Sequence, residues 1–129
     1  MSETTVTIER EYLAPAALVW ALLGDTGRFD RAMGLGLPAY RWELVDGRRE
    51  HIGRALQNGL KVEWIEPPYE WIEGRMLHGT RRFIKGPLGS GGVHIDVEPT
   101  PNGSRARARL WGDAPHWYMT CLLYTSRCV

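Results

Sequence analysis

The chain has 129 residues, 43% of them apolar and 24% charged, which is enough for one folded domain with an apolar core and too little for two. Sixteen Lys and Arg against 15 Asp and Glu give a formal net charge of +1, so no overall attraction to nucleic acid or an anionic membrane is expected. The N-terminus lacks the apolar stretch of a secretion signal, and the longest apolar run, LVWALL, is too short to span a bilayer. We therefore expect a cytoplasmic protein with no membrane span and no nucleic-acid partner.

Both cysteines, Cys121 and Cys128, fall in the last nine residues, CLLYTSRCV. Two cysteines cannot build a disulfide framework or a four-cysteine zinc site. The segment resembles the translation of a transposon end used in preparing sequencing libraries, running into an inverted copy of itself. We expect residues 121–129 to be an artefactual tail, residues 1–120 to form the domain, and the natural chain to continue past residue 120.

The N-terminal part of the chain predicts one strand and two short helices. Residues 5–13 alternate between apolar and polar side chains, the pattern of a half-buried strand. Pro15 then precedes AALVWALL, whose apolar residues recur at helical spacing up to a stop at Gly24. Asp25 or Thr26 is placed to cap a second short helix, which ends at Gly34.

From Tyr40 to Trp111 the helical period is absent and strand patterns alternate with turn-forming residues. The predicted turns are Asp46-Gly47, Asn58-Gly59, Pro67-Pro68, the run GPLGSGG at 86–92, and Asn102-Gly103. We read the glycine-rich run as a plain turn, since it lacks the Lys-Ser/Thr pair and the following helix of a phosphate-binding loop.

Two-residue turns at Asp46-Gly47 and Asn58-Gly59 fix the register of three strands. The inner face then pairs Trp42 with His51, Tyr40 with Gly53, Gly53 with Trp64, and Ala55 with Val62. The outer face collects Arg41, Glu43, Glu50, Arg54, Lys61 and Glu63, with Arg54 opposite Glu63.

The third turn, Asn102-Gly103, predicts two further inner pairs and two outer ones. Val97 is expected opposite Ala108 and Ile95 opposite Leu110 inside, with Asp96 opposite Arg109 and Glu98 opposite Arg107 outside. The arginine row that ends beside Trp111 is thereby neutralised, which argues against a nucleic-acid stripe.

Small residues beside large aromatic ones on the inner face predict a cavity that the aromatics wall without filling. Gly74, Ala106 and Ala108 are also expected to point inward. Gly53→Leu should then block an apolar probe, because the new side chain takes up cavity volume. The predicted ligand-binding residues are Tyr40, Trp42, His51, Gly53, Ala55, Val62, Trp64, Met76, Ile95 and Ala108.

One strand, two short helices and a long antiparallel meander resemble the helix-grip fold of the START-like superfamily, also called SRPBCC. The stretches LAPAALVWALLGDTGRFDRAMGL at 13–35, VEWIEPPYEWIEGR at 62–75 and RRFIKGPL at 81–88 are most similar to the SRPBCC domain that precedes the catalytic domain of bacterial class III adenylate/guanylate cyclases. The resemblance implies an α+β fold with a curved antiparallel sheet, a cavity for a small hydrophobic molecule, and a long C-terminal helix that this chain lacks.

Catalytic and metal-binding patterns are weak in this chain. The four histidines are spread singly, which predicts no metal site, and neither a cofactor motif nor a nucleophile motif is present. His51 faces the predicted cavity, where it is either a polar wall residue or a base. Glu66 and Glu70 flank the Pro-Pro turn and are not expected to form an acid–base pair.

We therefore predict a non-catalytic domain that binds a small hydrophobic or amphipathic ligand, as a sensory or regulatory part of a bacterial signalling protein with a possible downstream nucleotide cyclase. The alternative is an enzyme of the polyketide aromatase/cyclase type, in which the cavity folds the substrate and His51 assists proton transfer. A structural interaction module is the third possibility, favoured if side chains fill the inner face.

Overall fold

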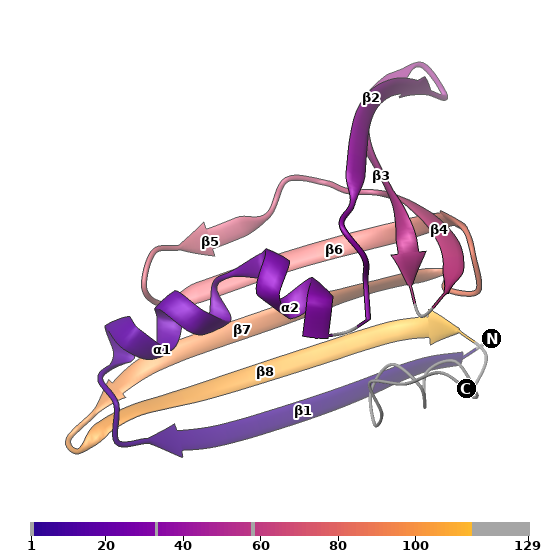
Figure 1. Ribbon diagram of the computed structural model, residues 1–129. Helices are drawn as coiled ribbons and strands as arrows, with labels where there is room; N and C mark the ends of the chain where they lie inside the picture. The colour runs from indigo at the N-terminus through magenta and orange to yellow at the C-terminus, as the bar shows by residue number, and fades with distance from the viewer. Residues whose placement is uncertain (1, 33, 58, 115–129) are drawn as a thin grey trace.

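In the part of the chain that the structure describes, one antiparallel sheet of eight strands carries two short helices across one face (Figure 1). The computed structural model describes residues 2–32, 34–57 and 59–114. The expected tail, 121–129, therefore lies outside the described residues. The elements are β1 (Ser2–Tyr12), α1 (Ala16–Leu23), α2 (Thr26–Ala32), β2 (Ala39–Val45), β3 (Arg48–Gln57), β4 (Leu60–Ile65), β5 (Glu70–Ile72), β6 (Met76–Lys85), β7 (Ser90–Thr100) and β8 (Gly103–Ala114).

The two predicted helices are confirmed. Pro15 precedes α1, and the Gly24 N–H donates to the Trp20 carbonyl (2.7 Å) where the helix ends. The Asp25 carboxylate accepts a hydrogen bond from the Arg28 backbone N–H (3.0 Å) and so caps the first turn of α2. Neither helix, nor any other in the described part of the chain, has the length and apolar character needed to cross a membrane.

The sheet order is β1-β8-β7-β6-β4-β3-β2, with β5 paired to β6. The register predicted from the first two turns is confirmed: Trp42 pairs with His51, and Gly53 with Tyr40 and Trp64. Asp46 and Gly47 both have positive φ, 52° and 79°, as the tight turn between two twisted strands requires.

The third predicted turn is wrong by one position, because Thr100 pairs with Gly103 and the turn residues are Pro101 and Asn102. A Cβ at Gly103 would overlap the backbone carbonyl of Tyr12, so this glycine permits close approach of the chain after β1 instead of forming the turn. The corrected inner pairs are Ile95–Ala108 and Val97–Ala106, and the outer pairs are Asp96–Arg107 and Glu98–Arg105. The shift of two residues keeps every side chain on its predicted face.

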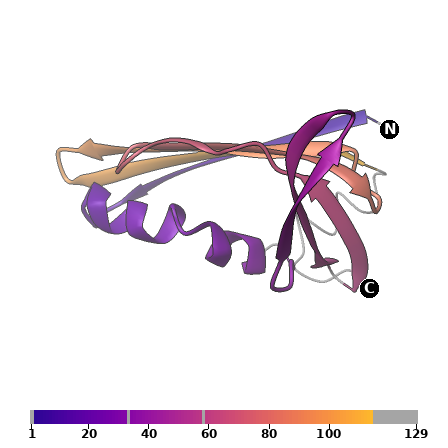
Figure 2. The ribbon, with the colours of Figure 1, turned by 90° about the horizontal axis from the view of Figure 1, so that it is seen from above.

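The sheet is curved, and β2, β3 and β4 bend toward the side that carries the helices (Figure 2). The concave, helix-bearing face holds the apolar core. One cluster packs α1 on the central strands through Val19, Leu77, Ile95, Val97 and Ala106. A second cluster joins Leu35, Val62 and Trp64 at the bent end of the sheet.

Candidate functional site

Aromatic side chains from β2, β3 and β4 gather on the concave face. The His51 ring is stacked between Tyr40 and Trp42, with centroid distances of 4.6 Å and 4.7 Å. Trp64 meets Tyr40 edge-on at 6.0 Å. Four of the predicted site residues are thereby brought together, because the alternation along each strand places them on one face.

A cavity of about 390 Å³ opens beside this stack. Such a volume lies near the lower end of the range for small-molecule sites. The connection after β4 supplies its second wall, opposite Trp42 and His51. The lining residues are Trp42, Arg49, Glu50, His51, Glu66, Pro67, Pro68 and Tyr69.

The predicted space at Gly53 is filled. A Cβ added to Gly53 would overlap the indole ring of Trp64, and Trp64 has no exposed surface. Val62, which is buried, and the partly buried Ala55 pack in the same cluster as Trp64. Because the Trp64 ring fills the space above Gly53, the cavity lies beside the aromatic stack and not above Gly53.

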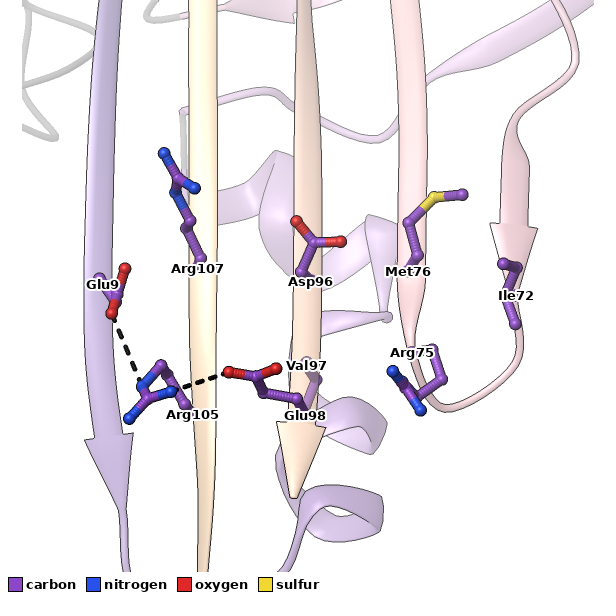
Figure 3. Close-up of a pocket in the computed structure, with 9 residues that line it drawn as sticks. All are labelled: Glu9, Ile72, Arg75, Met76, Asp96, Val97, Glu98, Arg105 and Arg107. Carbon is purple, nitrogen blue, oxygen red and sulfur yellow. Dashed lines mark hydrogen bonds and ion pairs between the residues drawn. The ribbon is translucent and has the colours of Figure 1, made fainter. Parts of the chain in front are cut away.

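Three other predicted positions are separated from the cavity. Ile95 and Ala108 belong to the core beneath α1. Met76, a predicted ligand-binding residue, pairs with Asp96 and lines the hollow on the other face of the sheet, away from the cavity beside Trp42 (Figure 3). Gly74 lies in the turn after β5, not on the inner face of a strand. Its φ of 79° is left-handed, a conformation that glycine adopts readily.

The sequence did not reveal a buried ionic network centred on Arg81. Its guanidinium makes two hydrogen bonds to the Asp30 carboxylate of α2 (3.1 and 3.0 Å) and one to Glu66 Oε1 (3.1 Å). Arg81 also donates to the Tyr69 hydroxyl (3.1 Å) and lies 4.6 Å from the centroid of the Trp64 ring. The network ties α2, β6 and the connection after β4 into one unit.

The signal that could have located this network is the position of Arg81 in its strand. Leu77, Gly79, Arg81 and Phe83 share one face, and the first of these is core. A charged residue in an inward series requires a partner of opposite charge beside it on that face. The identity of that partner, Asp30, depends on how α2 packs and is not readable from spacing.

Burial sets the protonation of the groups around this network. It raises the pKa of Tyr69 to about 12, and with the Glu66 charge it raises the pKa of Tyr40 to about 12. Burial opposes the charged form of Arg81, but Tyr69, Asp30 and Glu66 outweigh it and raise the pKa of the guanidinium. At neutral pH the two phenols therefore remain protonated beside a fixed guanidinium charge.

His51 and Glu66 face each other at the cavity wall. His51 Nδ1 lies 3.8 Å from Glu66 Oε2, and the Glu66 side chain is only 11% exposed. Glu66 also accepts a hydrogen bond from the Tyr69 hydroxyl (3.1 Å). The distance exceeds that of a hydrogen bond, and both side chains line the cavity, where a polar atom of a ligand can reach them.

The convex face carries a different kind of hollow, of about 650 Å³ (Figure 3). Arg105 makes ion pairs there with Glu9 (3.6 Å) and Glu98 (2.9 Å). These exposed ion pairs of Arg105 are typical of a solvated sheet surface. The prediction that charged residues of β7 and β8 lie on the outer face is confirmed.

Two histidines that are separate in the sequence, His78 and His94, are cross-strand neighbours whose Nδ1 atoms lie 3.0 Å apart. His94 Nε2 lies 3.1 Å from a carboxylate oxygen of Asp96. Across residues 2–32, 34–57 and 59–114, no group of three or more His, Cys, Asp or Glu side chains is arranged to hold a metal ion.

No protein-family model matches the chain, and no curated protein matches its sequence. Solved structures match its fold. Protein CV1439 from Chromobacterium violaceum has a TM-score of 0.58 at 19% identity, over 95% of this chain and 90% of that chain. TTHA0849 from Thermus thermophilus has a TM-score of 0.55 at 20% identity, over 94% and 82%.

A START superfamily protein from Mycobacterium smegmatis has a TM-score of 0.54 at 14% identity, over 88% of this chain and 77% of that chain. At such identities the likeness concerns the fold. The α+β fold with a curved antiparallel sheet and two short helices is therefore START-like, as the sequence resemblance implied.

Proposed function

We propose that this domain binds a small hydrophobic or amphipathic molecule in the cavity between Trp42, His51 and Tyr69. The observation that carries the proposal is an aromatic-walled cavity on the concave face with a few polar groups at one side. Ligand sites in proteins typically combine apolar walls with a small number of placed polar groups. A START-like fold agrees with this use.

The polar groups of the cavity favour a ligand with one polar end. Glu66 is held by Arg81 and Tyr69, so its carboxylate has a fixed position. His51 lies across from it, held between two aromatic rings. A hydroxyl or keto oxygen between these groups has both a donor and an acceptor within reach, while the apolar remainder contacts Trp42.

An environment-sensitive neutral probe, N-phenyl-1-naphthylamine, tests this binding by its fluorescence. Trp42 is 59% exposed, so Trp42→Ala removes a cavity wall without opening the core. We expect its affinity for the probe to fall about tenfold, equivalent to about 1.4 kcal/mol.

Ile84→Ala is the matched control, because Ile84 is a 49% exposed apolar residue of β6 that does not line the cavity. We expect this variant to bind the probe as the original chain does. Equal affinities in Trp42→Ala and Ile84→Ala would refute the site.

The proposed role is that of a cytoplasmic sensory or regulatory domain in a bacterial signalling protein. It rests on the stretches at 13–35, 62–75 and 81–88, which resemble the domain that precedes bacterial nucleotide cyclases. Reading the gene downstream of codon 120 tests it. A cyclase domain whose activity responds to the cavity ligand is the expected result, and an unrelated or absent downstream domain would overturn the role.

A second candidate function is proton-transfer chemistry of the polyketide aromatase/cyclase type. The closeness of His51 and Glu66 at the cavity wall (3.8 Å) favours it, since a paired acid and base is what enolisation of a keto chain requires. Deuterium exchange at the central carbon of a bound 1,3-diketone, followed by NMR, measures this reaction. Exchange that is faster than in buffer and slowed in His51→Gln supports catalysis, whereas exchange at the buffer rate refutes it.

A further inference from the structure

A second hollow on the helix-bearing side lies between α1 and β5 and measures about 700 Å³. It shares only Tyr69 with the cavity described above. We call it the α1–β5 groove. Trp71 pairs with Leu77, whose side chain is in the core beneath α1, so the Trp71 ring lies on the same face as α1. Trp20 of α1 lines the groove from the other side.

All the charged side chains that line this groove are acidic. They are Asp25, at the junction of the two helices, and Glu73, after β5; no Lys, Arg or His occurs among the described residues of the lining. Glu73 accepts a hydrogen bond from the indole N–H of Trp20 (3.2 Å), which fixes the carboxylate beside the ring. Within the described residues, the hydrogen bond that Asp25 accepts comes from the Arg28 backbone N–H, so two carboxylates and two indole rings line the α1–β5 groove.

The residues that line the groove therefore favour a positively charged ligand. The face of an indole ring attracts a cation, and the attraction grows where the cation is partly removed from water. Carboxylates at the same groove add a Coulombic attraction and repel an anionic head group. Ala17, Ala21 and Leu77 supply apolar contact along the rest of the lining.

We propose that the α1–β5 groove binds an organic monocation with apolar substituents, such as an alkylated ammonium group. Trp20 and Trp71 contact the cationic head, and Glu73 and Asp25 balance its charge. This inference goes beyond the proposed function, because the groove and the cavity beside Trp42 are separate hollows with different lining charges.

Three single-chain amphiphiles of equal tail length test the proposal: octyltrimethylammonium, octyl glucoside and octyl sulfate, each below its micelle concentration. Calorimetry measures their affinities, and the indole N–H resonances in NMR spectra report the place of binding. We expect the ammonium compound to bind more tightly than the neutral and anionic ones, to shift the Trp20 and Trp71 resonances, and to weaken as salt is added. Equal affinities for octyltrimethylammonium and octyl glucoside would overturn the proposal.

Variants separate the groove from nonspecific attraction. Trp71 is 61% exposed, so Trp71→Leu keeps an apolar side chain while removing the ring, and we expect about fivefold weaker binding of octyltrimethylammonium. Glu73→Gln keeps an acceptor for Trp20 while removing the charge, and we expect a loss of about threefold.

Glu70→Gln is the matched control, because it removes the same charge from β5 at an exposed residue on the opposite face. An unchanged affinity in Glu70→Gln is expected. The same loss in Glu70→Gln as in Glu73→Gln would show that net charge, not the groove, attracts the cation. Trp42→Ala distinguishes the two hollows. It should weaken the binding of N-phenyl-1-naphthylamine and leave the affinity for octyltrimethylammonium unchanged.

Discussion

Replacing Arg81 with methionine leaves the carboxylates of Asp30 and Glu66 without their cation. These side chains are 16% and 11% exposed, so water compensates little of the lost interaction. Removing one partner of a buried ion pair costs about 3–5 kcal/mol, because an uncompensated charge stays buried. The lost contact between the guanidinium and the Trp64 ring adds about 1 kcal/mol.

The free energy of unfolding in urea measures this loss. Domains of this size have a total of about 5–15 kcal/mol, so we expect Arg81→Met to be close to unfolding at room temperature. Arg82→Met is the control, because Arg82 is exposed on the other face of the same strand, and a change within about 0.5 kcal/mol is expected there.

A double variant identifies the cause. Arg81→Met combined with Asp30→Leu removes both members of the bidentate pair, and we expect it to be more stable than Arg81→Met alone. If Arg81→Met unfolds at the same urea concentration as the original chain, the network does not hold the concave face together and the reasoning is wrong.

Three further changes have expected outcomes. Gly53→Leu should lower the free energy of unfolding by about 3 kcal/mol or more, because its side chain displaces the buried Trp64 ring; an unchanged urea midpoint would contradict this. Ser104→Ala removes a fully buried hydroxyl that donates to the Ala14 carbonyl (2.8 Å), with an expected loss of about 1–2 kcal/mol in the same assay. The raised pKa of Tyr69 means that its phenol stabilises the fold fully below pH 10.0 and loses that effect as the pH rises toward about 12. In Tyr69→Phe, spectrophotometric titration should lack one late-ionising tyrosine and the alkaline loss of stability should be smaller; an unchanged titration curve would refute the assignment.

The sequence was informative wherever a short-range rule applied. Pro15 and Gly24 bound the first helix as predicted, and the turn at Gly47 set a register that the structure confirms. These features depend on backbone conformation within a few residues, which local sequence controls. The stack of Tyr40, His51 and Trp42 follows from that register without further information.

The errors arose where a distant element decides the outcome. Gly103 looks like a turn glycine, but the chain after β1 packs against it. Gly53 suggests open space on the inner face, but the Trp64 ring packs against it and fills that space. Arg81 contacts Asp30 because α2 packs across the sheet. None of these partners is fixed by spacing along the chain, so alternation predicts which face a residue occupies and not what occupies the space above it.

The central claim, that the concave cavity binds a small apolar molecule, is tested most directly by NMR mapping of N-phenyl-1-naphthylamine on the protein. Intermolecular NOEs from the probe should connect to the rings of Trp42, His51 and Tyr69, which line the cavity. Residues of the convex hollow, such as Met76 and Arg107, should show none. NOEs confined to the convex face, or absent from the three cavity rings while the probe is bound, would contradict the account.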